Sequence, residues 1–144
     1  MSALVLALGL LSTMAHAEPT DRFAVAGLTE AQVRKTFDAL QAAVTADDAD
    51  AVSRLVVYPL RVNGRSNRRI RDRRAFLAAY QDLFDAKLRS IVRRQRFEDL
   101  FVNWQGVMLG EGALWISGIC ERPSKPFECR NPRIGIITIN QTRD

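Results

Sequence analysis

Hydrophobic and aromatic positions dominate one long stretch of the chain, residues 100–120 (LFVNWQGVMLGEGALWISGIC). Its β-branched and aromatic side chains favour strands, and the two glycines around Glu111 give the backbone the freedom that a tight turn needs. The stretch therefore predicts a hairpin of two long strands joined by Gly110-Glu111-Gly112. One hairpin alone is not stable in water, so the preceding helices and a further strand must cover one of its faces.

The two faces of this hairpin differ in chemistry, because successive side chains of a strand point to opposite sides. With Leu109 paired to Ala113, one face is free of charges and amides, and we expect Trp104 to lie in the core on that face. The other face has the mixed composition of a small-molecule pocket, and equally that of a half-solvated outer surface. The candidate ligand-binding residues, which include one from a preceding helix, are Asn103, Gln105, Trp115, Ser117 and Tyr80.

Apolar residues before the hairpin recur at helical spacing. Val33, Phe37, Leu40 and Val44 form one apolar stripe, and the preceding residues 29–32 (TEAQ) match a capping box. We therefore predict a helix that ends near residue 46.

Two further helical regions are predicted between this helix and the hairpin. The first covers residues 49–56 and begins among three aspartates, which favour the helix dipole and lack the glycine and distal glutamate of a calcium loop. The second begins after Asp72 and continues through residues 85–94. Its first part carries a one-sided apolar stripe, made of Phe76, Leu77, Tyr80, Leu83 and Phe84.

Three shorter segments complete the predicted sheet. Residues 57–63 (VYPLRVN) form a strand, and Pro59 assigns it to an edge or a bulge. A turn at Asn63-Gly64 leads to a short return strand at residues 68–71, and residues 133–140 (RIGIITIN) form the last strand. The order of these elements predicts an α+β fold, with helices on one face of a twisted antiparallel sheet.

Three segments resemble the nuclear transport factor 2-like superfamily: ADDADAV at residues 46–52, YPLRVN at 58–63 and FVNWQGVMLGEGALWI at 101–116. This superfamily has a cone-shaped α+β fold and includes ketosteroid isomerase and polyketide cyclases. The resemblance covers residues 29–140 and implies N-terminal helices packed on a curved antiparallel sheet. A homodimer through the sheet is one candidate assembly.

The start of the chain predicts export. Met1 to Met14 is almost wholly apolar, and Ala15-His16-Ala17 fits the cleavage pattern of a secretory signal peptide. We expect cleavage before Glu18, a leader at residues 18–27, a single domain at residues 28–144, and a periplasmic or secreted location. The apolar run is too short to span a bilayer, so no membrane span is predicted.

The two cysteines fit an oxidising compartment. Cys120 and Cys129 flank an eight-residue loop (ERPSKPFE), and the simplest interpretation is a disulfide. A redox motif has a two-residue spacing, and a structural zinc site needs four ligands. Neither pattern is present, so we predict no metal and no cofactor.

Few residues are available for catalysis. The only histidine, His16, lies in the predicted signal peptide, which excludes histidine-based triads and metal sites from the mature protein. Enzymes of the resembled superfamily use an Asp with a Tyr or a His inside the cone, and no position here matches that pattern. Glu98 and Asp99 are weak catalytic candidates, as cavity acids, or else are a solvated loop pair.

Positive charge is concentrated in one segment. Residues 61–96 carry twelve Lys or Arg against three Asp, whereas the rest of the chain carries nine against thirteen acidic residues. Cations are disfavoured at a helix N-terminus, so arginines before the third helix suggest either an anion site or a solvated basic face. The anion-binding or partner-binding candidates are Arg61, Arg65, Arg68, Arg69, Arg71, Arg73 and Arg74.

Three functions stay open from the sequence. The first is an exported, non-catalytic domain with a basic face that binds a small ligand, an anionic envelope component or a protein. The second is an isomerase- or cyclase-type enzyme with a cavity carboxylate. The third is a protein inhibitor or immunity-type factor that docks on an acidic partner. Nucleic acid is not expected as a partner in an exported protein.

Overall fold

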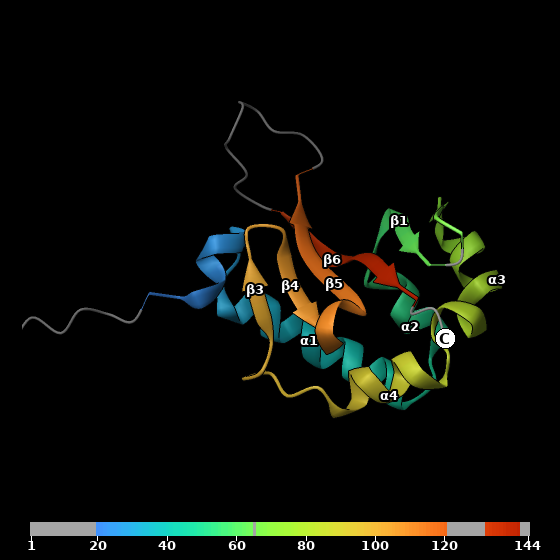
Figure 1. Cartoon of the computed structure of the whole chain (residues 1–144), viewed down its shortest axis with the longest axis horizontal. Helices are drawn as coiled ribbons and strands as arrows, with labels where there is room; N and C mark the ends of the chain where they lie inside the picture. The colour runs from blue at the N-terminus through green and yellow to red at the C-terminus, as the bar shows by residue number, and fades with distance from the viewer. Residues whose placement is uncertain (1–19, 65, 121–131, 142–144) are drawn as a thin grey trace, which may run out of the picture.

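The computed structural model describes residues 20–64, 66–120 and 132–141. The fold is α+β, with helices packed on a curved, mixed sheet (Figure 1). The helices are η1 (Arg22–Ala26), α1 (Glu30–Thr45), α2 (Ala49–Arg54), α3 (Arg73–Leu83), α4 (Ala86–Arg94) and η2 (Gly110–Gly112). The strands are β1 (Val56–Asn63), β2 (Arg68–Ile70), β3 (Phe101–Asn103), β4 (Gly106–Leu109), β5 (Leu114–Ile119) and β6 (Arg133–Asn140).

The sheet has the strand order β2-β1-β6-β5-β4-β3. Neighbouring strands are antiparallel except β1 and β6, which are parallel, so the sheet is mixed rather than purely antiparallel. The parallel pair joins the first strand to the last, a contact that local patterns do not specify. The register of β1 shifts between Val56 and Arg61, which places the predicted irregularity around Pro59 in an interior strand.

The helix boundaries follow from side-chain caps. Thr29 and Gln32 form the predicted capping box of α1, whose Thr29 hydroxyl accepts a hydrogen bond from the Gln32 amide at 3.3 Å. Asp72 caps α3 and Asp85 caps α4 in the same way, each through its carboxylate. Caps of this kind satisfy amide groups that have no partner within the helix.

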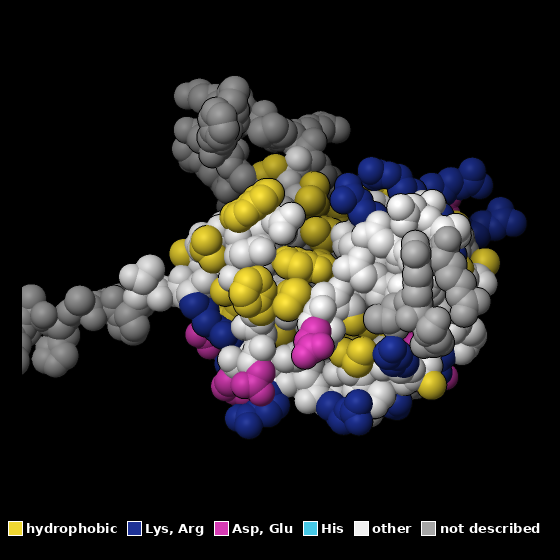
Figure 2. All heavy atoms as spheres, in the orientation of Figure 1, with side chains coloured by type: hydrophobic (Ala, Val, Ile, Leu, Met, Phe, Trp, Pro, Cys, Tyr) yellow, Lys and Arg dark blue, Asp and Glu magenta, His cyan; other side chains and the backbone are white. Residues whose placement is uncertain are grey.

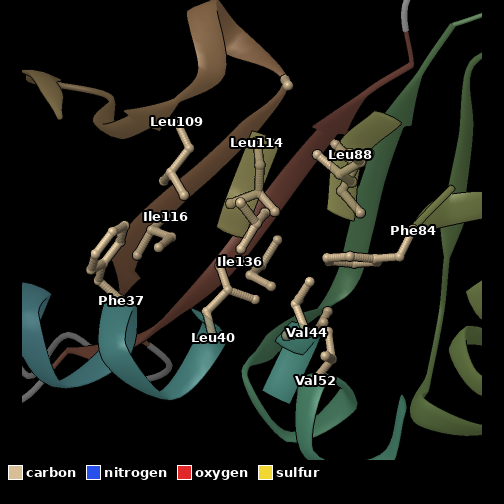
Figure 3. Close-up of a cluster of buried hydrophobic side chains, with 14 of the residues drawn as sticks. Phe37, Leu40, Val44, Val52, Phe84, Leu88, Leu109, Leu114, Ile116 and Ile136 are labelled. Atoms are coloured by element: carbon tan, nitrogen blue, oxygen red, sulfur yellow. The ribbon is translucent and has the colours of Figure 1, made fainter. Parts of the chain in front are cut away.

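The core lies between the helices and one face of the sheet (Figure 3). Phe37 and Leu40 of α1 point toward Ile116 and Ile136 of the sheet. All four side chains are at most 3% exposed. Val52, Phe84 and Leu88 continue the same core from α2, from the end of α3 and from α4. Figure 1 shows α1 behind β3–β5, and no described helix covers the opposite side of β3 and β4.

The predicted long hairpin is divided into three strands. Asn103 pairs with Gly106, so Trp104 and Gln105 form a two-residue turn between β3 and β4. The Asn103 carboxamide oxygen accepts the Gln105 amide hydrogen bond at 2.8 Å, and Gly106 has a φ of 141° that favours glycine. The expectation that Trp104 lies in the core is wrong, since it is 77% exposed at this turn.

The register of the second hairpin differs from the predicted one by one residue. Leu109 pairs with Leu114, and Met108 pairs with Trp115, because the connection contains four residues rather than three. This shift brings Leu109 and Leu114 into the core together, each fully buried. Trp115 points to the other face with Met108, and both are half-buried. A slip of one position exchanges the two faces of a strand, so the predicted faces were mixed.

Candidate functional site

The five candidate ligand-binding residues do not form one pocket. Asn103 and Gln105 lie at the β3–β4 turn, where their side chains contact each other. Trp115 and Ser117 lie on β5, and Ser117 is only 8% exposed beside Gly106. Tyr80 lies apart from them, on the buried face of α3.

Tyr80 has an unusual environment within that core. Its ring stacks on Phe84 at 5.4 Å between centroids, and the Arg89 guanidinium lies 5.5 Å from the ring. The hydroxyl is buried and has no hydrogen-bond partner among the described residues. Burial raises the pKa of Tyr80 above its usual value of 10.0, and the nearby Asp47 carboxylate raises it further. Tyr80 is therefore neutral at physiological pH.

The two catalytic candidates lie in solvent. The side chains of Glu98 and Asp99 are each 64% exposed, and both face Arg96 at 3.9 and 3.8 Å. A general acid or base is normally tuned by burial or by close charges in a cavity. Of the two alternatives that the sequence left open for Glu98 and Asp99, their exposed positions fit a solvated loop pair and not a cavity acid.

Two of the seven candidate arginines lie directly opposite each other. Arg61 of β1 pairs with Arg69 of β2, and both side chains are exposed. Neither makes an ion pair or a side-chain hydrogen bond within the described part of the chain. Like charges at directly opposite positions of a sheet destabilise it, so this arginine pair (Arg61 and Arg69) is electrostatically uncompensated.

The arginine pair borders an open depression of about 390 Å³, lined also by Asn63 and Asn67. Amide and guanidinium groups together present several hydrogen-bond donors. Lys and Arg side chains gather in this part of the molecule, at the upper right of Figure 2 beside β1. The arrangement suits an oxyanion, since planar guanidinium groups bind carboxylate and phosphate through paired hydrogen bonds.

Two other arginines of the cluster have a carboxylate partner on a helix. Arg68 contacts Asp82 at 2.5 Å, because strand alternation directs it to the face opposite Arg69, toward α3. Arg73, at the first position of α3, contacts Asp50 of α2.

The two remaining described arginines are more exposed. Arg71 contacts Asp72 at 3.2 Å with 87% of its side chain exposed, and Arg74 is exposed on α3. Carboxylates at 50 and 72 therefore offset cations at the start of α3. Arg65 lies outside the described residues.

The structure also contains a cavity that the sequence did not indicate. It has a volume of about 370 Å³ and lies between α4, η2 and the end of β6. Its apolar wall comes from the end of α3, from α4 and from β6, and its polar residues include Asp85 and Glu111. We call it the α4 cavity; the residues of its apolar wall used below are Leu83, Leu88, Ile91 and Ile139. These residues come together only in the folded chain, so no local pattern marks them as a group.

Some expectations concern residues that lie outside the described ranges. The predicted signal peptide at residues 1–17 and Cys129 are among them, while Cys120 follows directly after β5. The disulfide stays a prediction. Within the described residues, no group of three or more His, Cys, Asp or Glu side chains is arranged to hold a metal ion. No helix of the described part is both long and apolar enough to cross a bilayer.

Comparisons with known proteins do not assign the chain to a family. No protein-family model matches the chain, and neither the curated proteins nor the solved structures give a significant match.

Proposed function

We propose that this protein is an exported, non-catalytic binding domain of the nuclear transport factor 2-like type, and that its arginine pair binds oxyanions of an anionic envelope component. The fold of helices on a curved mixed sheet is compatible with that superfamily. The single observation that carries the proposal is the uncompensated pairing of Arg61 with Arg69. Two cations that face each other with no ion pair among the described residues form a surface that can bind an anion.

The neighbouring residues support this assignment by contrast. Arg68 and Arg73 belong to the same segment, yet each has a carboxylate partner. Arg93 and Arg94 also have no ion pair among the described residues, but only Arg61 and Arg69 face each other across paired strands and border a common depression. The exposed positions of Glu98 and Asp99 give the isomerase or cyclase alternative no cavity carboxylate at the expected place.

A homodimer through the sheet belongs to the same proposal. The uncovered face of β3–β5 carries Phe101 and Ile119, which are 50% and 40% exposed. Exposed apolar side chains on one face of a sheet are typical of an interaction surface. Figure 2 shows hydrophobic side chains gathered over these strands.

The proposal is tested by replacing the arginine pair with Arg61→Gln and Arg69→Gln together. We expect the double variant to lose most binding to phosphatidylglycerol vesicles or to polyglutamate, whichever the wild type binds, with no binding of either protein to phosphatidylcholine vesicles. Vesicles and polyglutamate distinguish a phosphate from a carboxylate target. The matched control is Arg93→Gln with Arg94→Gln, which removes the same charge from exposed arginines on α4 that have no ion pair within the described part of the chain.

Cosedimentation at low and at physiological salt gives the readout. Exposed charges are screened beyond about 8 Å at physiological ionic strength, so binding should weaken as salt rises. Equal binding by the wild type and the Arg61/Arg69 variant would refute the proposal. Binding to neither anion, together with salt-sensitive binding to an acidic protein, would instead support the inhibitor-type alternative.

A further inference from the structure

The connection between β4 and β5 holds a glutamate in an unusual backbone conformation. Glu111 has φ 53° and ψ 33°, in the left-handed region, and lies between Gly110 and Gly112, which also have positive φ. A residue with a Cβ adopts this backbone conformation only at an energetic cost. The conformation therefore persists only where the surrounding structure holds the backbone in place. The conformation fixes where the Glu111 side chain leaves the loop.

The surroundings fix this loop from two sides. On the α4 side, the Gly110 amide donates a hydrogen bond to the Gln95 side chain at 3.0 Å, and a Cβ at Gly110 would collide with Ile91. On the β6 side, the Asn140 side chain donates to the Gly112 carbonyl at 2.6 Å. The loop is therefore held in place before any ligand arrives, a condition that favours specific binding.

Beside this loop lies the α4 cavity. Its volume of about 370 Å³ falls in the lower part of the range of small-molecule sites, roughly 300–1,000 Å³. Leu88 and Ile91 of α4 and Ile139 of β6 give it an apolar wall. A ligand that fits must therefore have an apolar body.

The charges of the cavity select the sign of the ligand. The Asp85 carboxylate accepts a hydrogen bond from the Leu88 amide at 2.8 Å as the cap of α4. The Lys87 side chain is not free either, since this residue already has an interaction partner. Glu111 is exposed and has no ion pair or hydrogen bond among the described residues. Among these three charged residues, only a carboxylate is left without a partner, in a chain of net charge +5.

We propose that the α4 cavity binds a small amphipathic cation, an alkyl or aryl ammonium compound. Its apolar body lies against Leu88, Ile91 and Ile139, and its ammonium group pairs with the Glu111 carboxylate. The site is separate from the arginine pair and does not depend on the anion-binding function.

The test uses the whole protein and three probes of one shape: 2-phenylethylammonium, the neutral 2-phenylethanol and the anionic 3-phenylpropanoate. Chemical shifts of backbone amides are followed at concentrations up to about 20 mM, because a ligand this small is expected to bind in the millimolar range. We expect the cation to shift the amides of residues 110–113 and 139–141, and to bind more tightly than the other two probes.

Two variants identify the counter-charge. Glu111→Gln should weaken binding of the cation about threefold, the size expected for one solvent-accessible ion pair, and should leave the neutral probe unaffected. Glu111→Gly tolerates the left-handed backbone and should have the same effect, so the test survives if the Gln variant does not fold. Glu98→Gln removes an exposed carboxylate elsewhere and should change nothing.

Three results would overturn the inference. They are the absence of shifts at these residues with every probe, equal binding of the cation and the neutral probe, and unchanged cation binding by both Glu111 variants. Arg61→Gln with Arg69→Gln should retain cation binding even if it loses anion binding, so failure of one site is distinguishable from failure of the other.

Discussion

The two ends of the sheet expose opposite kinds of surface. At the β2–β1 end, Arg61 and Arg69 face each other, and neither has a carboxylate partner among the described residues. At the β5–β4–β3 end, the uncovered face exposes large apolar side chains, with Phe101 50% exposed and Trp104 77% exposed at the turn. Both ends therefore expose side chains outside the buried core. The difference indicates two separate interaction surfaces, one electrostatic and one apolar, on the same sheet.

The largest expected effect separates the core from the turn at the apolar end. Ile116→Ala should lower the free energy of unfolding by about 2–5 kcal/mol, because it removes a fully buried side chain. Trp104→Ala should lower it by less than about 1 kcal/mol, because an exposed turn residue contributes little to packing. Urea denaturation of the two variants measures both values. If Trp104→Ala lowered the free energy of unfolding more than Ile116→Ala, Trp104 would be a core residue of a continuous hairpin and not an exposed turn residue.

The next effect concerns association through the apolar end. Phe101→Asp places a charge on the uncovered face of β3, and we expect it to convert a concentration-dependent dimer into a monomer. Little change in unfolding is expected at a position that is half exposed. Sedimentation velocity over a concentration series gives the readout, with Leu77→Asp on the exposed side of α3 as the control. A wild-type protein that stays monomeric at all concentrations would contradict the proposed homodimer through this face.

The smallest effect compares two adjacent arginines. Arg68→Gln removes the ion pair with Asp82 and should destabilise the fold by about 0.2–1 kcal/mol. Arg69→Gln removes a like-charge contact with Arg61 and should stabilise the fold by a similar amount. The opposite signs at neighbouring positions are the distinctive outcome. The same sign for both variants, measured by urea denaturation at low salt, would mean that the pairing does not govern their energetics.

Local signals in the sequence predicted much of this fold. The α1 stripe, the capping box at Thr29 and the Asp72 cap each depend on residues within a few positions, and the structure has all three. The last strand also has its predicted bounds, Arg133–Asn140. Such elements are specified by short-range physics, namely helical periodicity, strand alternation and satisfaction of the first backbone amides.

Features that depend on the choice between close alternatives were missed. The NWQG turn at Trp104 lies within an apolar run that reads equally well as a continuous strand. The Gly-Glu-Gly connection closes a hairpin with three residues or with four, and only core packing selects the pairing of Leu109 with Leu114. The parallel pairing of β1 with β6 joins segments too distant for any local pattern.

The candidate site shows the same limit. The basic segment was visible in the sequence, but its division was not, because Asp50 and Asp82 reach Arg73 and Arg68 only through tertiary packing. Strand alternation alone separates Arg68 from Arg69, and this part was within reach of the sequence. The α4 cavity has no sequence signal, since its wall combines α3, α4 and β6.

Thermal unfolding in inorganic phosphate, compared with chloride at equal ionic strength, tests whether Arg61 and Arg69 form the anion site. We expect phosphate to raise the Tm of the wild type and of Arg93→Gln/Arg94→Gln, because an anion that binds only the folded state stabilises it. For Arg61→Gln/Arg69→Gln we expect a Tm in chloride at or above that of the wild type, and no further rise in phosphate. A double variant that is less stable in chloride and still gains as much from phosphate as the wild type would contradict the claim that this arginine pair is the anion site.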